Sequence, residues 1–129
     1  MASVGVGLMG FGRIGRNLFR ILYQSKAIRL AAISDIADHK ALEYLLRFDT
    51  ILGQFPDEVS IKEDHLYVAG RQIPMLSEPE PGDVPWGDLG VDVVIEATAR
   101  KWSREKLEQH LACGTRTPAV LERIHVDAA

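Results

Sequence analysis

A glycine pattern near the amino terminus has the residue types and the spacing to bind a diphosphate. Residues 10–15 read Gly-Phe-Gly-Arg-Ile-Gly, a G-x-G-x-x-G motif between a short apolar run and a segment of helical periodicity. Gly10 permits a tight turn, Gly12 keeps side chains away from a phosphate, and Gly15 lets a helix lie close to the preceding strand. The N–H groups at the start of that helix would face the phosphates. The chemistry indicated is dinucleotide binding.

An acidic residue follows at the distance that such a site requires. Asp35 stands twenty positions after Gly15, at the end of the apolar run 29–34. A carboxylate there accepts hydrogen bonds from the hydroxyls of the adenosine ribose and repels a 2′-phosphate, so the pattern favours NAD over NADP. Two simpler interpretations stay open, a glycine turn that only bends the chain and a plain strand-end turn at Asp35.

These residues need a parallel sheet to bring them together. Apolar, partly β-branched runs predict the strands, and the early order strand-helix-strand-helix indicates an α/β domain of Rossmann type. An antiparallel meander is expected as a small insert near residues 58–76, after a loop over 48–56. The predicted parallel strands lie near residues 3–8, 29–35 and 91–97.

Three helices are expected beside this sheet. The first spans about residues 13–24, and the second spans 38–48 with Asp38 as its N-cap. A third begins after Ser103, which can cap it, and ends at Cys113. The residues expected to face the sheet from this third helix are Leu107 and Leu111.

Composition excludes several classes of protein. The 129 residues are 47% hydrophobic and 26% charged, with a formal net charge of −3, which is typical of one soluble globular domain. The dispersed basic residues predict no nucleic-acid or membrane partner, and a cytoplasmic location is the default expectation. Cys113 is the only cysteine and is expected to be a buried structural thiol. No metal site is predicted, and the histidines expected at the surface or in loops are His39, His65, His110 and His125.

The glycine segment belongs to a longer ordered pattern. Residues 4–114 resemble the NAD-binding part of glyceraldehyde-3-phosphate dehydrogenases, which are glycolytic oxidoreductases, and more loosely that of erythrose-4-phosphate dehydrogenases. The segments that carry the likeness are 6–16, Ser34-Asp35, Phe48-Asp49-Thr50, Gly53-Gln54-Phe55, Pro81, Trp86-Gly87 and 93–98.

The resemblance implies a set of cofactor-binding residues. Arg13 and Ile14 would bind the pyrophosphate through backbone N–H groups, Asp35 would bind the ribose, and Thr98 would line the cleft. A solvated side chain for Arg13 and a helix-capping role for Thr98 are the alternatives. The full implied set is Gly10, Phe11, Gly12, Arg13, Ile14, Gly15, Asp35 and Thr98.

The chain also departs from the family pattern. Met9 and Ser34 replace two asparagines, Pro79 stands where an arginine is common, Ala99 replaces a glycine, and Lys101 replaces an aromatic residue. These changes affect the surroundings of the adenine and ribose more than the pyrophosphate loop.

Catalytic segments of the family have no counterpart here. The resemblance implies a nucleophilic cysteine in a Ser-Cys-Thr-Thr-Asn segment and a later histidine, and neither is present among the 129 residues. The chain alone is therefore expected to be inactive as a dehydrogenase. A non-catalytic nucleotide-binding or regulatory module and a structural or interaction domain are the alternatives.

The likeness stops near Gly114, and the remaining 115–129 have an unusual feature. Residues 121–129 back-translate to a string of successive restriction-enzyme recognition sequences, which predicts a vector-derived tail; a natural divergent terminus is the alternative. Without its family neighbour, the strand at 91–97 would expose an apolar edge. We expect either residues 119–126 to fill that place or the edge to self-associate.

Overall fold

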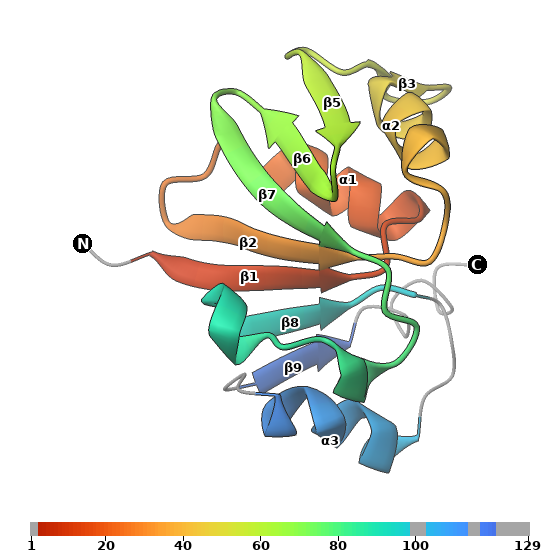
Figure 1. Cartoon of the computed structure of the whole chain (residues 1–129). Coiled ribbons are helices and arrows are strands. Elements are labelled where there is room, and N and C mark those ends of the chain that lie inside the picture. The colour runs from red at the N-terminus through yellow and green to blue at the C-terminus, as the bar shows by residue number, and fades with distance from the viewer. Residues whose placement is uncertain (1–2, 99–102, 114–116, 121–129) are drawn as a thin grey trace.

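The computed structural model describes residues 3–98, 103–113 and 117–120, and its centre is a seven-stranded sheet (Figure 1). Across the sheet the strand order is β5-β6-β7-β2-β1-β8-β9. The strands are β1 (Val4–Met9), β2 (Ile28–Ser34), β5 (Val59–Lys62), β6 (His65–Val68), β7 (Arg71–Leu76), β8 (Val93–Glu96) and β9 (Thr117–Val120).

The parallel part of this sheet confirms the predicted fold class. β1 pairs in parallel with β2 on one side and β8 on the other, β2 pairs with β7, and β8 pairs with β9. These five strands therefore run in the doubly wound order, in which the chain first adds strands on one side of β1 and then on the other. Their carboxyl ends meet at one edge, where the arrowheads of Figure 1 gather. A crevice for a ligand is expected at that edge, between β1 and β8.

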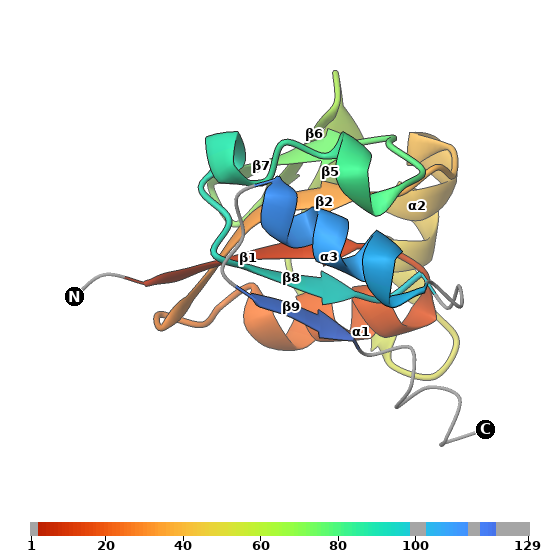
Figure 2. The same cartoon turned by 90° about the horizontal axis from the view of Figure 1, so that it is seen from below.

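Helices cover both faces of the sheet. They are α1 (Arg13–Leu22), α2 (His39–Arg47) and α3 (Arg104–Ala112), and Figure 2 shows α1 and α3 on opposite sides of β1 and β8. The predicted N-caps are confirmed. Asp38 Oδ2 accepts from the Ala41 N–H at 3.1 Å, and Ser103 Oγ accepts from the Lys106 N–H at 3.2 Å. Each cap satisfies a donor that the helix itself leaves without a partner.

An aromatic cluster fixes α1 against the sheet. Phe19 is fully buried, with its ring 5.6 Å from the rings of Phe11 and Tyr23 and 5.9 Å from that of Phe55. Arg20 extends the cluster outward, because its guanidinium lies over the Phe55 ring. Burying a large apolar side chain stabilises the fold by about 1.5–3 kcal/mol. The helix that follows the glycine turn is thus held in place by its own hydrophobic face.

Trp86 organises the opposite face. Its fully buried side chain packs with Met9, Val91 and Val94. The residue of β1 beneath the indole ring has to be a glycine, since a Cβ added at Gly7 would come within 2.6 Å of that ring. Short 3-10 helices lead the chain over this face, namely η1 (Pro81–Asp83) and η2 (Gly87–Leu89).

Two regions differ from the sequence expectation. The predicted loop at 48–56 contains a hairpin of β3 (Phe48–Asp49) and β4 (Gly53–Gln54), because Asp49 Oδ1 accepts from the N–H groups of Ile51 and Leu52, both at 2.7 Å. These side-chain bonds build a turn that hydrophobic periodicity does not register. The meander β5-β6-β7 is present as predicted, but it is continuous with the main sheet through β7.

The third helix also packs differently. Leu111, expected against the sheet, is 39% exposed, and the residue before it, His110, is fully buried instead. At the sheet edge, β9 pairs with β8 from Val93 to Glu96, so the chain itself supplies a neighbouring strand over 117–120. The remaining part of the expected segment, 121–126, lies outside the described residues. No helix of the described residues is long and apolar enough to cross a membrane.

The aromatic cluster predicts how stability depends on alkaline pH. Burial, together with the 2.7 Å hydrogen bond from the Tyr23 hydroxyl to Asp57 Oδ2, raises the pKa of Tyr23 from its ordinary value of 10.0 to about 12. A raised pKa favours the neutral hydroxyl in the folded state, so its contribution to stability is complete below pH 10 and is lost between about pH 10 and 12.

We expect Tyr23→Phe to destabilise the chain at pH 8 and to differ less from the wild type as the pH approaches 12. Urea unfolding at a series of pH values measures this difference. The matched control is Tyr44→Phe, a change to a ring that is 63% exposed on α2. A difference between Tyr23→Phe and the wild type that is constant across this pH range would contradict the account.

Candidate functional site

The turn after β1 brings the ends of three strands together. The Gly10 N–H donates to the Ser34 carbonyl of β2 at 2.7 Å. On its other side, a Cβ added at Gly10 would lie 2.8 Å from the Ala97 carbonyl and the Thr98 nitrogen, just beyond β8. Gly10 also has φ of +104°, a conformation that only glycine adopts without strain. The first glycine of the motif is thus required by both its conformation and its neighbours.

The other two glycines have different surroundings. A Cβ at Gly15 would overlap the carbonyl oxygen of Gly10, so its absence lets α1 begin directly against the turn. A Cβ at Gly12 would meet no atom within 4 Å, so the space in front of this residue is open. Gly12 is also the N-cap of α1 and has no side chain to bond the first-turn N–H groups. Those N–H groups form a positively polarised surface that favours an anion.

Asp35 is fixed beside the same turn. Its carboxylate accepts from the Phe11 N–H at 2.6 Å through Oδ2 and from the Ala37 N–H at 2.7 Å through Oδ1. A carboxylate has about four acceptor positions, so each oxygen can still accept from a ligand hydroxyl. The structure therefore brings the predicted ribose-binding residue to the predicted pyrophosphate loop and holds it in one orientation.

Phe11, Arg13 and Ile14 enter this region through their backbone. The Phe11 ring is fully buried in the aromatic cluster, the Arg13 side chain is exposed, and Ile14 is half-buried. The exposed guanidinium agrees with the solvated alternative for the Arg13 side chain. What these residues can offer to a ligand in the open space at Gly12 is the N–H groups of Arg13 and Ile14.

Arg16 is a residue that the sequence analysis did not assign. Its side chain is buried, and Nη1 donates to the Phe11 carbonyl at 3.0 Å. This hydrogen bond stabilises the glycine turn from the interior of the domain. Burial, followed by repulsion from Arg13, lowers the pKa of Arg16 from its ordinary value. The sequence signal that could have predicted this role is an arginine on a helix face whose other residues pack inward.

Thr98 lies at the carboxyl end of β8, across β1 from Asp35. Its hydroxyl donates to Glu96 Oε1 at 2.6 Å, and its N–H points to the same oxygen at 3.4 Å. The N-cap of α3 is Ser103, so Thr98 does not cap this helix. Gly10, Asp35 and Thr98 thus lie together at the carboxyl edge of the sheet, and their binding of a cofactor stays a prediction.

His110 contradicts the expectation that the histidines lie at the surface or in loops. It is fully buried, with Nε2 2.9 Å from Glu96 Oε2 and Nδ1 2.9 Å from Trp86 Nε1. Sequence reasoning missed it because a lone histidine on a short helix gives no signal without its partners. A charged residue inside an apolar strand, Glu96, was the available hint, since a buried carboxylate requires hydrogen-bond donors.

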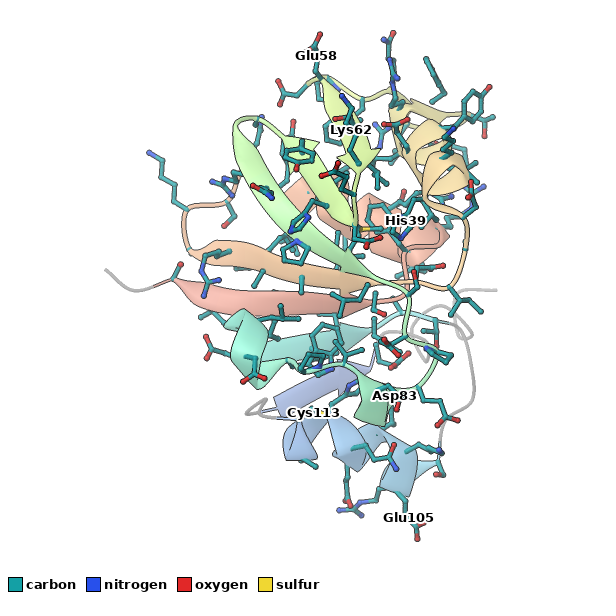
Figure 3. All side chains as sticks on the ribbon, viewed as in Figure 1. His39, Glu58, Lys62, Asp83, Glu105 and Cys113 are labelled. Atoms are coloured by element: carbon teal, nitrogen blue, oxygen red, sulfur yellow. The ribbon has the colours of Figure 1, made fainter. Side chains whose placement is uncertain are left out.

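Cys113 is half-buried and does not have the fully buried position that was expected. Its Sγ donates to the Gly82 carbonyl at 3.3 Å, and burial, with the nearby Asp83 charge, raises the pKa of the Cys113 thiol. Figure 3 places Cys113 and Asp83 on the α3 side of the sheet and His39 on the α2 side. Within 3–98, 103–113 and 117–120, no three His, Cys, Asp or Glu side chains form a possible metal site.

Two of the departures from the family pattern, Met9 and Ser34, have structural roles. Met9 is buried beneath Trp86, and the Ser34 hydroxyl donates to the Glu78 carbonyl at 3.1 Å and accepts from the Glu78 N–H. Ser34 thus connects the end of β2 to the segment after β7. Pro79 is exposed, while Ala99 and Lys101 lie outside the described residues.

The strand order, the glycine turn and the acidic residue at the end of β2 define a dinucleotide-binding α/β domain. Comparison with known families gives the same result, because residues 4–104 match the profile described as "Glyceraldehyde 3-phosphate dehydrogenase, NAD binding domain". The chain belongs to the glyceraldehyde-3-phosphate dehydrogenase family, and NAD is the cofactor of the domain that it matches.

Curated relatives show the same relation. The chain is 46% identical over 115 residues to glyceraldehyde-3-phosphate dehydrogenase from Streptomyces coelicolor, with 88% of this chain covered. It is 45% identical over 113 residues to the Thermotoga maritima enzyme, with 86% covered, and 40% identical over 114 residues to that of Geobacillus stearothermophilus, with 88% covered. In each case the match covers 34% of the relative, so the chain spans about a third of their length.

The glycine geometry predicts effects of very different size for the same substitution at two positions. Gly10→Ala should destabilise the chain by more than about 2 kcal/mol, because the new Cβ meets backbone atoms at a positive φ. Gly12→Ala should cost less than about 1 kcal/mol, because its Cβ enters open space. Urea denaturation of both variants beside the wild type measures this. Equal losses at the two positions would contradict the geometry.

Proposed function

We propose that this chain binds NAD at the carboxyl edge of its sheet, as the NAD-binding portion of a phosphorylating glyceraldehyde-3-phosphate dehydrogenase-like oxidoreductase. The observation that carries the proposal is the turn itself. Open space in front of Gly12 adjoins the start of α1, and the Asp35 carboxylate is held 2.6 Å from the Phe11 nitrogen. The diphosphate would accept from the Arg13 and Ile14 N–H groups.

The acidic residue supports a preference between the two nicotinamide cofactors. A fixed carboxylate with free acceptor positions suits the 2′- and 3′-hydroxyls of the adenosine ribose, because hydroxyls donate hydrogen bonds. A 2′-phosphate would bring negative charge to the same place. Asp35 is the residue that offers a carboxylate at the end of β2, held there by the Phe11 and Ala37 N–H groups, so NAD is the proposed ligand.

The chemical steps belong to residues outside this chain. The 129 residues contain neither the cysteine segment nor the later histidine that the family resemblance implies for thiohemiacetal formation. The chain's part in catalysis is to bind and orient the cofactor. The whole protein's substrate would be a phosphorylated aldehyde, with the three-carbon compound favoured by the names of the relatives.

Three further expectations stay proposals. Self-association would use the edge of the seven-stranded sheet that β9 forms. A cytoplasmic location agrees with the composition, and a vector-derived tail agrees with the back-translation of 121–129. Sequencing the encoding DNA downstream of codon 114 tests the tail directly.

Calorimetric titration of the 129-residue chain tests the proposed cofactor site. We expect NAD to bind more tightly than NADP, and Asp35→Asn to weaken NAD by about 10- to 100-fold while reducing the preference over NADP, since hydrogen bonds to a charged group are lost. Asp88→Asn, an exposed substitution in η2, is the matched control. Equal NAD affinity in the wild type and Asp35→Asn would remove Asp35 from the site.

We also expect no dehydrogenase activity from the chain alone. Mixing it with glyceraldehyde-3-phosphate, phosphate and NAD should give no increase in NADH absorbance, because no thiol is placed to attack an aldehyde beside the cofactor. The control is Cys113→Ser, which should behave identically. NADH production that depends on Cys113 would refute the proposal that catalysis requires residues outside this chain.

A further inference from the structure

Strands β2 and β7 pair only at their carboxyl ends, and Figure 1 shows them diverging toward their amino ends. The pairs are Ile33 with Met75 and Ser34 with Leu76. Over residues 71–74, β7 pairs with β6 instead. Within the part of the chain that the structure describes, residues 28–32 of β2 therefore have no strand partner on the side that faces β7.

A cleft of about 620 Å³ lies between the diverging strands. This volume falls within the range of roughly 300–1,000 Å³ that is usual for ligand sites in proteins. Its inner wall is apolar, since it includes Leu30 and Ile73, whose side chains are buried in the core. The cleft lies at the amino ends of the strands, at the opposite edge of the sheet from the candidate cofactor site.

The charged side chains that line this cleft are all positive. They are Lys26, Arg29 and Arg71, and the described lining includes no acidic residue. Each of the three is exposed, and none forms an ion pair with another of the described residues. Because the whole chain has a formal net charge of −3, the cleft is a local concentration of positive charge. Its charge is complementary to an anionic ligand.

The two arginines lie on opposite faces of the sheet. Arg71 Nη1 donates to the carbonyl of Tyr23, the C-cap of α1, at 2.9 Å. Arg29 Nη2 donates to the carbonyl of Gly90, the C-cap of η2, at 3.1 Å. Figure 2 shows α1 on one side of the sheet and the short helices on the other. Each guanidinium is thus tethered through one of its five N–H groups and can still bind a carboxylate through others.

An extended peptide fits both the open strand edge and this placement of charge. Successive side chains of a strand point to opposite faces of its sheet. A strand added along β2 would therefore direct one acidic side chain to the face of Arg29 and the next to the face of Arg71. Its backbone would pair with the open edge over 28–32. A small inorganic anion would use neither the strand edge nor the apolar wall.

We propose that the cleft between β2 and β7 binds an extended acidic peptide segment of a partner protein as an additional strand along β2, with neighbouring carboxylates on Arg29 and Arg71. Apolar side chains of the peptide pack on Ile73. Lys26, in the connection before β2, increases the attraction of the acidic segment to the cleft. This binding is independent of the proposed cofactor site.

Fluorescence anisotropy with labelled synthetic peptides and the full 129-residue chain tests the proposal. The probe is Thr-Val-Glu-Glu-Val-Thr, which should bind the wild type and weaken as salt is added. One control peptide, Thr-Val-Lys-Lys-Val-Thr, reverses the charge. The other, Thr-Pro-Glu-Glu-Pro-Thr, keeps both carboxylates but lacks N–H groups that a strand donates. Both controls should bind at least about tenfold more weakly than the probe.

Variants of the chain test the two arginines separately. Arg29→Gln and Arg71→Gln should each weaken the probe about fivefold, because each removes one ion pair at an exposed site. The matched control is Arg104→Gln, which removes an exposed charge on α3 and should bind like the wild type. Hydrogen exchange of the wild type needs no variant. The probe should slow the exchange of amides within 28–32 and leave those within 10–15 unchanged.

Each contrary result overturns the proposal. No binding of the probe at millimolar concentration, or equal binding of the lysine peptide, would remove the acidic peptide as the ligand. Equal binding of the proline peptide would show charge attraction without an added strand. If Arg29→Gln and Arg71→Gln both bind like Arg104→Gln, or if amides within 28–32 exchange at the same rate with the probe bound, the cleft is not the site.

Discussion

The contact between the glycine turn and the ends of β2 and β8 is the constraint on which the rest of the structure depends. Gly10 donates to Ser34 on one side and approaches the Ala97 carbonyl so closely on the other that a Cβ would lie 2.8 Å from it. This spacing leaves room only for bare backbone at the place where β1 ends and α1 begins. The aromatic cluster beneath α1 keeps the helix there, with its N–H groups facing the open space at Gly12.

Two sets of hydrogen bonds fix the orientation of a polar side chain on each side of this turn. On the β2 side, the Asp35 carboxylate is oriented by the Phe11 and Ala37 N–H groups before any ligand arrives. On the β8 side, Thr98 is oriented through Glu96. Groups that are already in place lose less conformational freedom when a ligand binds, which favours affinity. The domain thus presents the N–H groups at the start of α1 between two polar residues, an arrangement that supports the proposed binding of a dinucleotide.

The sequence predicted the features that arise from neighbouring residues. Glycine spacing, apolar periodicity and the capping residues Asp38 and Ser103 correctly gave β1, β2 and β8, the three helices and the carboxyl-edge position of Asp35. Features that depend on distant partners were missed. His110 is buried because Trp86 and Glu96, 24 and 14 positions away, are its hydrogen-bond partners. A pattern of neighbouring residues does not predict contacts between residues so far apart in the sequence. The β3–β4 hairpin was missed for a different reason, because a side chain builds its turn.

A crystal structure of the chain with NAD would show directly where the cofactor binds. We expect the diphosphate oxygens to lie within hydrogen-bonding distance of the Arg13 and Ile14 N–H groups. We also expect the adenosine ribose hydroxyls on the Asp35 carboxylate and the second nucleoside over the end of β8. A ligand bound away from the turn, or a turn that stays empty at saturating NAD, would contradict this expectation.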